Sequence, residues 1–234
     1  MRKSVITQKD LRELPAYGLA EAAGYLRLPK STLRAWLLGQ RYYDDQGKAR
    51  RFHPVITIAD PKDRQLSFIN LVEAFVLAGI RREHSIPLPK VRKAVDYLRR
   101  SFDSRRPLAE EQFVTDGVDL FVDKYGALIG ATQEGQLQMK EILHGRLKLV
   151  RRDLNGVPEK LVLFSAPANQ PLAADVVIDA RLSFGRPVLD GLGVRTAVLA
   201  ARFTAGESID ALSRDYGAAP EAIQNALRCE LLAA

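Results

Sequence analysis

Residues 19–38, LAEAAGYLRLPKSTLRAWLL, contain two helical patterns separated by a break. Apolar residues recur at helical spacing in both halves: Leu19, Ala22, Ala23 and Leu26, then Leu33, Trp36 and Leu37. Pro29 disfavours helical geometry at the residue before it, so the chain is expected to turn there and to start a second helix at Lys30 or Ser31. Two short helices joined by a turn of about three or four residues form the helix-turn-helix pattern.

The second helix opens with residue types suited to DNA. Thr32 and Arg34 lie off its apolar stripe and are expected to face outward, and Lys30 and Ser31 precede them. Hydroxyl groups can bind phosphates or base edges, while Lys and Arg can reach phosphates or guanine acceptors. Free backbone N–H groups at the helix start add a phosphate site. The pattern favours DNA binding over an ordinary helical hairpin in which Ser31 only caps the helix.

A basic β-ribbon is predicted directly after the two helices. Gly39 is a good helix stop, and residues 40–60 then contain a tyrosine pair, a turn signal at residues 44–47 and a strand-like run at residues 52–58. A ribbon in this position is a wing. Its cations, expected to contact phosphates or the minor groove, are Arg41, Lys48, Arg50 and Arg51. The alternative is a solvated basic hairpin.

Two helices are predicted beyond the wing. Residues 66–77 are apolar nearly all round, which indicates a buried helix. The next helix, ending near Phe102, keeps Val91, Val95 and Leu98 at helical spacing, with lysines and arginines on its other face. Such a basic run is usually a solvated helix face, so no specific role is assigned to it.

The order of these elements, and three short segments within residues 17–102, carry a family resemblance. The segments are Leu19-Ala20-Glu21-Ala22-Ala23, Ser31-Thr32-Leu33-Arg34-Ala35-Trp36 and Leu66-Ser67-Phe68. This part of the chain resembles the MerR-like winged helix-turn-helix domains, which implies DNA binding. A long coiled-coil dimerisation helix and an effector domain, both usual in that family, are not visible in this sequence.

Residues 103–175 differ in character and are expected to form a small β-rich connecting unit. Residues 113–122 alternate between apolar and polar around a central turn, which predicts short strands. A helical turn is expected at residues 138–143, and a hairpin about Asn155-Gly156 at residues 147–164. The carboxylates on the first of these segments favour a solvated hairpin over a metal site: Asp116, Asp119 and Asp123.

The last stretch predicts two short strands, at residues 175–178 and 184–188, followed by three helices. The helices are expected at about residues 196–204, 208–216 and 220–232, and they form a second helix-turn-helix. Its candidate contact residues lie on a locally acidic background, where phosphate repulsion weakens DNA binding: Glu221, Gln224, Asn225 and Arg228. Operator binding is therefore assigned to the front motif, and the rear motif to dimer or partner contact.

A second family resemblance covers residues 183–228. The pattern consists of Gly185-Arg186-Pro187-Val188, Gly191, Gly206-Glu207-Ser208-Ile209, Tyr216, Ile223 and Ala226-Leu227. It closely resembles the small domain of unknown function found in antitoxins paired with PIN-domain ribonuclease toxins. One departure is Leu192-Gly193, where the family commonly has Thr-Arg. The two resemblances together are typical of the larger VapB-type antitoxins of type II toxin–antitoxin systems, and imply repression of the operon and direct binding of a PIN-domain toxin.

Charge is unevenly distributed along the 234 residues, whose net charge is +7. Residues 1–106 hold 22 Lys and Arg against 11 Asp and Glu, which gives +11, whereas residues 107–234 hold 13 against 17, which gives −4. A basic front and a mildly acidic rear indicate nucleic acid at one end and a different partner at the other. This asymmetry favours DNA binding over a small-molecule enzyme.

Composition and motif content favour a cytoplasmic binding protein. No apolar run approaches the ~18 residues of a membrane span, and no secretory signal is evident. The single cysteine, Cys229, excludes an internal disulfide and a cysteine-based zinc site. No nucleophile–base pair, metal-ligand spacing or phosphate loop is evident, so neither an enzyme, nor a metal, nor a cofactor is expected.

We therefore expect an α+β chain, mainly α, in three parts: a winged helix-turn-helix domain at residues 1–102, the β-rich connecting unit at residues 103–175, and a three-helix domain at residues 176–234. The predicted function is a DNA-binding antitoxin that represses its own operon and neutralises a PIN-domain ribonuclease toxin. A stand-alone transcriptional regulator is the alternative. A homodimer is expected on its operator DNA, through residues 68–77 or through a terminal group: Leu227, Leu231 and Leu232.

Overall fold

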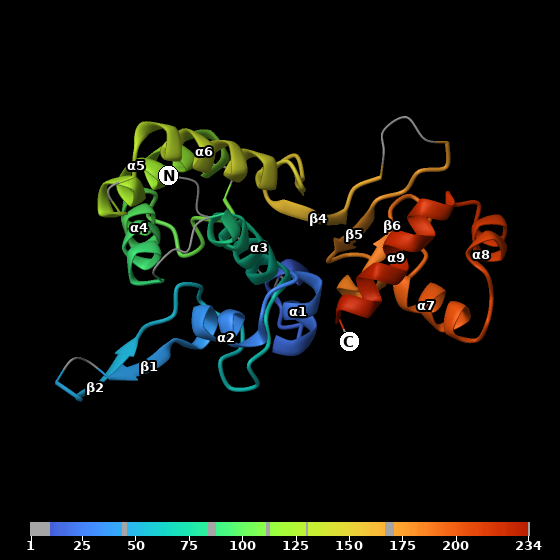
Figure 1. The fold of residues 1–234 in the computed structure, drawn as a ribbon, viewed down its shortest axis with the longest axis horizontal. Helices are drawn as coiled ribbons and strands as arrows, with labels where there is room; N and C mark the ends of the chain where they lie inside the picture. Colours follow the sequence, from blue (N-terminus) through green and yellow to red (C-terminus); the bar gives the residue numbers. More distant parts are fainter. Residues whose placement is uncertain are drawn as a thin grey trace.

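The helix-turn-helix predicted from residues 19–38 is present. The computed structural model describes residues 10–43, 46–83, 88–110, 113–129, 131–166 and 171–233. A short helix η1 (Leu11–Glu13) leads to α1 (Leu19–Tyr25) and α2 (Lys30–Leu38) (Figure 1). Gly39 ends α2 with φ 75°, and a Cβ there would meet the carbonyl oxygen of Phe52. Only glycine therefore fits where the chain turns into the wing.

The wing is a two-stranded antiparallel ribbon at one end of the molecule, formed by β1 (Gln40–Tyr43) and β2 (Ala49–Phe52) (Figure 1). Its predicted turn is described only from residue 46 onward. The strand expected at residues 52–58 is wrong beyond Phe52. Val55 and Ile56 instead donate their N–H groups to the Trp36 carbonyl and bury their side chains. They leave the ribbon because burying two aliphatic side chains in the core is more favourable than exposing them on a wing.

The buried helix predicted after the wing is α3 (Phe68–Glu83), and it is followed by α4 (Leu88–Ser101). Every residue from Phe68 to Gly79 is buried, as Leu71, Val72 and Val76 illustrate. Residues 68–77 were a candidate dimer interface, and that assignment is wrong because this helix is already covered on all sides by its own chain.

Residues 113–129 and 133–147 are helical, which corrects the predicted β-rich connecting unit over these ranges. They form η2 (Phe113–Gly117), α5 (Val118–Ile129) and α6 (Gln133–Leu147). The apparent alternation hides a helical pattern, because the buried residues recur three and four positions apart: Val118, Phe121, Val122 and Tyr125. Asp119 and Asp123 lie on α5 and pair with Lys140. Among the described residues, no cluster of His, Cys, Asp and Glu is placed to hold a metal ion.

A four-stranded antiparallel sheet connects the middle of the chain to the rear. It contains the predicted hairpin, β3 (Val150–Arg152) and β4 (Pro158–Phe164), followed by β5 (Val176–Asp179) and β6 (Val188–Leu189). The strand expected at residues 184–188 begins only at Val188, because the chain forms the short helix η3 (Ser183–Gly185) before it. The three predicted rear helices are α7 (Thr196–Thr204), α8 (Ile209–Tyr216) and α9 (Pro220–Ala233).

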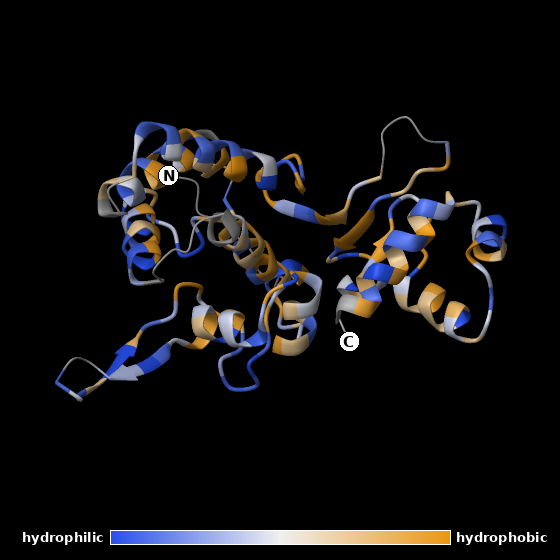
Figure 2. Ribbon diagram, in the orientation of Figure 1, coloured by the Kyte–Doolittle hydropathy of each residue, from blue (hydrophilic) through white to orange (hydrophobic). Residues whose placement is uncertain are grey.

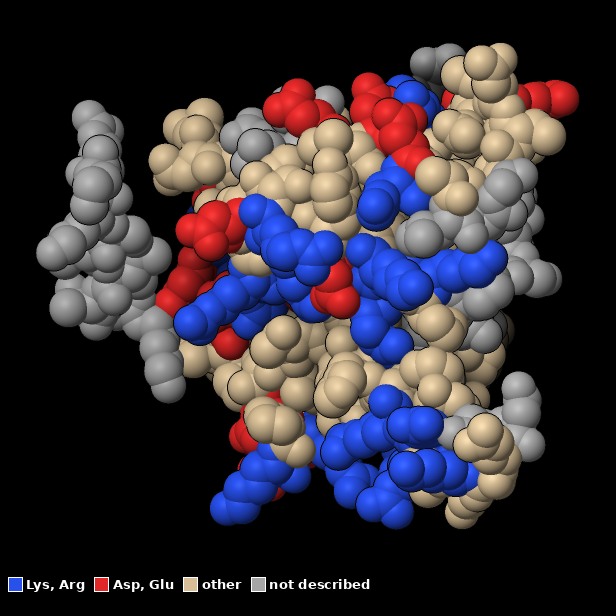
Figure 3. All heavy atoms as spheres, turned by 90° about the vertical axis from the view of Figure 1, so that its left-hand side faces the viewer, with Lys and Arg blue, Asp and Glu red and all other residues tan. Residues whose placement is uncertain are grey.

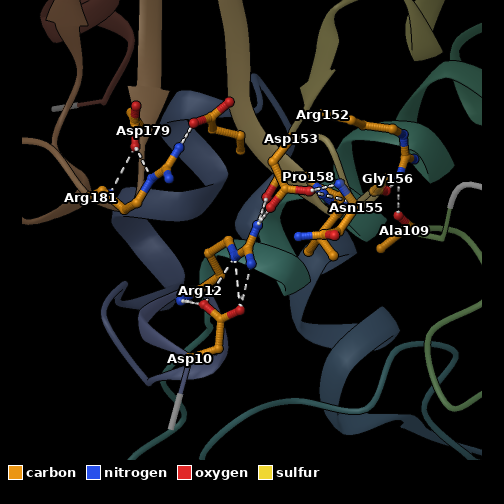
Figure 4. Close-up of polar contacts among 12 residues, drawn as sticks. Asp10, Arg12, Ala109, Arg152, Asp153, Asn155, Gly156, Pro158, Asp179 and Arg181 are labelled. Atoms are coloured by element: carbon orange, nitrogen blue, oxygen red, sulfur yellow. Dashed lines mark hydrogen bonds and ion pairs between the residues drawn. The ribbon is translucent and has the colours of Figure 1, made fainter. Parts of the chain in front are cut away.

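The hairpin is also tied to the start of the described chain. Arg12 in η1 bonds to Asp10 at 2.7 Å and to Asp153 at 2.6 Å (Figure 4). Arg152 donates to the carbonyls of Ala109 and Gly156, both at 2.7 Å. The Arg12–Asp153 contact joins residues 141 positions apart in sequence, and the Arg152–Ala109 contact joins residues 43 positions apart, so the hairpin is fixed to two earlier segments of the chain.

One hydrophobic core runs from Tyr17 to Ile178 and includes α3, α5 and β4, while a second encloses α7, α8 and α9. Figure 2 shows hydrophobic residues concentrated on α3 and β5, between the layers that cover them. The fold is α+β, as predicted. The division of the chain into domains at residues 102 and 175 remains a prediction. The first core contains residues on both sides of residue 102. Within the described residues, no helix is long and apolar enough to cross a membrane.

Candidate nucleic-acid interface

Helix α2 presents a polar face because its apolar stripe is fixed in the core. Leu33, Trp36 and Leu37 are buried. Pro29 is the N-cap, and its carbonyl accepts the N–H groups of Thr32 and Leu33. Ser31 is therefore a helical residue and not the cap.

The predicted outward residues of α2 are exposed with one exception. Lys30, Ser31 and Arg34 lie on the surface. Thr32 is only 9% exposed, so the expectation that it faces outward is wrong. Most of its side chain is covered, although Thr32 borders the groove described next.

A groove of about 1110 Å³ separates α2 from the base of the wing and from the turn before α3. Six of the eight residues predicted from the sequence line it: Lys30, Ser31, Thr32, Arg34, Arg41 and Arg51. The wing thus returns toward the start of α2 and adds its cations to those of the helix. The other two predicted residues, Lys48 and Arg50, are exposed farther along the wing.

The groove also contains a residue that sequence reasoning missed. Arg64 lies opposite the wing, in a turn closed by backbone hydrogen bonds between Asp60 and Gln65. Its φ is 55°, a left-handed conformation that is uncommon for a non-glycine residue. The polar segment Asp60-Pro61-Lys62-Asp63 signals a turn, but only the tertiary structure brings that turn to the helix-turn-helix.

Arg51 has a structural role beside its place in the groove. Its Nη2 donates to the Leu38 carbonyl at 3.2 Å. Carbonyl groups at a helix C-terminus lack intrahelical partners, and a cation there is favoured by the helix dipole. Arg51 therefore fastens the second wing strand to the end of α2.

A second basic surface lies beside the wing, on α4. Figure 3 shows lysine and arginine gathered in two areas of one face of the molecule, the lower of them on the wing. On α4, Lys93 and Arg100 are exposed, two helical turns apart. Arg99 donates to the Val55 carbonyl, which joins α4 to the segment that leaves the wing. The helix whose basic face was given no role by the sequence is thus joined to the segment that follows the wing.

The second helix-turn-helix is placed differently. Asn225, Ala226 and Ile223 on α9 are buried, and α9 packs against α1. Gln224 and Arg228 are exposed. The exposed part of α9 therefore offers one arginine, whereas the front motif combines the cations of α2 with those of the wing.

The geometry defines a helix-turn-helix protein with a basic wing. A family model described as "Putative DNA-binding HTH domain" matches residues 15–95, and one described as "Protein of unknown function (DUF433)" matches residues 176–228. These matches coincide with the front motif and with the rear segment whose resemblance was recognised from the sequence.

Similar proteins extend over almost the whole chain. "Putative antitoxin VapB45" of Mycobacterium tuberculosis is 30% identical over 92% of this chain and 93% of its own length. "Uncharacterized protein Rv2308" of the same organism is 26% identical over 96% of this chain and 92% of its own length. The crystal structure of Rv2018 from Mycobacterium tuberculosis has a TM-score of 0.69 and 27% identity, and covers 92% of this chain and 98% of that one. The chain belongs to the VapB-type antitoxin family.

Proposed function

We propose that this chain is a DNA-binding antitoxin that represses its own operon and neutralises a PIN-domain ribonuclease toxin by direct binding. The groove between α2 and the wing carries the DNA part of the proposal, because it unites exposed Lys and Arg side chains with a helix start. Family membership supports the antitoxin part. It also favours a binding protein over an enzyme.

In the proposed complex, the start of α2 enters the major groove. Ser31 and Arg34 contact base edges or phosphates there, and Lys30 contacts a phosphate. The wing cations Arg41, Lys48, Arg50 and Arg51 follow the phosphates or the minor groove. Arg64, which lines the protein groove with α2 and the wing, contacts the DNA phosphate backbone.

A fluorescence anisotropy titration tests operator binding. The full chain is titrated into a labelled duplex from the promoter of its own operon, and into a random duplex of the same length. Tighter binding to the promoter duplex, with both affinities falling as salt rises, is expected. Equal affinity for the two duplexes contradicts operator recognition.

Toxin neutralisation needs its own test. The toxin proposed is the PIN-domain protein encoded beside this chain, and its RNA cleavage is measured with and without equimolar antitoxin. Loss of cleavage together with co-elution is expected. A stand-alone regulator, the alternative function, binds the promoter duplex but neither co-elutes with such a protein nor inhibits it.

We also propose a homodimer, since a single recognition helix reads only a few base pairs and two-fold symmetry doubles the site. Of the terminal group, Leu227 is buried and Leu231 is 78% exposed, while the side chain of Leu232 lies outside the described residues. Leu231 is thus the surface candidate. Light scattering at tens of micromolar is expected to give twice the chain mass, and a monomer mass contradicts the proposal.

A further inference from the structure

The loop before β6 in the rear part of the chain contacts the first helix of the helix-turn-helix. Tyr17 Oη donates to the Gly185 carbonyl at 3.0 Å, and this contact is buried. The guanidinium of Arg186 forms an ion pair with Glu21 and lies 5.8 Å from the centroid of the Tyr17 ring. Arg186 belongs to the Gly-Arg-Pro-Val motif, to which the proposed function gives no role.

Glu21 is a junction for α1. Besides Arg186, it accepts the N–H of Gly18 at 3.3 Å and the hydroxyl of Tyr25 at 3.0 Å. The Gly18 contact satisfies a backbone donor at the start of the helix, and a carboxylate there is favoured by the helix dipole. Arg186 thus holds the residue that organises both ends of this short helix.

Helix α1 transmits its position to the DNA-binding helix. Ala22, Ala23 and Leu26 on α1 are buried in the core that also contains Leu33 and Trp36 of α2. On its other side, α1 packs against α9 of the rear part. Because packed cores are bistable rather than continuously deformable, a change in how α1 is held shifts α2 as well.

The loop is held in an unfavourable conformation by this contact. Ser183, Phe184 and Gly185 have consecutive φ values of 48°, 56° and 74°. A Cβ at residue 185 would collide with the Tyr17 hydroxyl, so only glycine allows the approach. Backbone strain of this kind persists where the surrounding structure imposes it.

From these contacts we infer that Arg186 is a positioning residue of the DNA-binding site. It does not line the groove. It acts through Glu21 and α1 on the orientation of α2 relative to the wing. The inference rests on the proposed function and deepens it, because it makes operator affinity depend on the loop of the rear part.

The test compares Arg186→Ala with Arg202→Ala. Both arginines pair with carboxylates and have similar side-chain exposure, 34% and 31%, but Arg202 pairs with Glu207 and Asp215 within the rear part. Arg186→Ala is expected to weaken binding of the full chain to its promoter duplex by about five-fold, at the low end of known couplings between sites. Binding to a random duplex stays unchanged, since the phosphate-contacting cations are intact. Arg202→Ala is expected to leave both affinities unchanged.

Two further measurements separate positioning from a general loss of stability. Arg186→Lys keeps the charge opposite Glu21 and is expected to restore affinity to within about two-fold of wild type. Hydrogen exchange of the α2 amides is expected to speed up in Arg186→Ala and to stay unchanged in Arg202→Ala. Equal affinity and equal exchange in the two alanine variants overturn the inference.

If Arg186→Ala does not fold, Glu21→Gln replaces it, because it removes the carboxylate charge that pairs with Arg186. The same changes support the inference, and their absence overturns it. If the wild-type chain binds neither duplex, the proposed function fails. In that case faster exchange in α2 still supports the coupling to Arg186, and unchanged exchange overturns it.

Discussion

Arg92 on α4 lies over the ring of Phe52 on β2, with 5.3 Å between the guanidinium carbon and the ring centroid. Phe52 in turn stacks on Tyr42 of β1 at 4.0 Å. Cation–π contacts of this type are worth about 0.5–1 kcal/mol at exposed sites. The basic helix and the wing are therefore held side by side, and one nucleic acid can meet both.

Lys93 and Arg100 on α4 are expected to add phosphate contacts outside the groove. Replacing both with Ala should weaken binding to a long promoter duplex and reduce the magnitude of the salt dependence by about two, one for each lost phosphate contact. A duplex trimmed to the sequence beneath α2 and the wing should show a smaller loss. Arg214→Ala, on the exposed side of α8, is the control. An equal loss with both duplexes would contradict the placement of α4.

Substitutions of Arg34 and of Arg50 are expected to have different effects on DNA binding. Arg34→Ala should cost about 1–3 kcal/mol of operator binding and relax sequence preference, if Arg34 reads a base as proposed. Arg50→Ala should weaken binding to all sequences alike and lower the salt slope by about one. Arg50 is chosen over Arg51, which also bonds to the end of α2. Titrations against promoter and random duplexes at two salt concentrations measure both effects; a sequence-independent loss in Arg34→Ala would contradict its assignment.

Glu73 on α3 is expected to make stability depend on pH. It is 1% exposed, and burial raises its pKa to about 7, although Arg106 lies 3.5 Å away. A carboxyl group whose pKa is raised on folding contributes stability that is fully present when the pH lies below its pKa in the unfolded chain. This contribution is lost as the pH rises through the folded-state pKa of about 7.

In the wild-type chain, ionisation of Glu73 should lower the free energy of unfolding by on the order of 1–3 kcal/mol between about pH 5 and pH 8. Glu73→Gln should remove this pH-dependent loss. Urea unfolding at both pH values measures it. Glu141→Gln, on the exposed side of α6, is the matched control and should keep the wild-type dependence. The same slope in Glu73→Gln as in wild type would rule out this carboxyl group as its source.

Phe184 is expected to be a source of strain without a packing benefit. It is 90% exposed and has φ 56°. A left-handed conformation costs a non-glycine residue about 1–2 kcal/mol, which glycine avoids at some entropic cost. Phe184→Gly should therefore stabilise the chain by about 0.5–1 kcal/mol in urea unfolding. Leu172 is likewise exposed, at 66%, and has φ 58°, so Leu172→Gly serves as a second test of the same effect.

The helix-turn-helix could be predicted because its signals are local. The spacing of Leu33, Trp36 and Leu37 and the break at Pro29 each act within one or two turns. The prediction of strands within residues 113–125 was wrong because apolar residues recur there both two and three to four positions apart. Only the burial of the side chains in the folded chain shows which spacing applies. Arg64 and Arg186 were not assigned because their partners lie on distant segments, which no local pattern encodes.

The sheet has a consequence for how such chains can be recombined. β4 pairs with β5 along the register Lys160 to Asp179 and Leu161 to Ile178, although the rear family match begins only at residue 176. An exchange of the rear part at that boundary would pair β4 of one chain with β5 of another. A chain recombined at residue 176 therefore keeps its four-stranded sheet only if the incoming β5 matches β4 in this register.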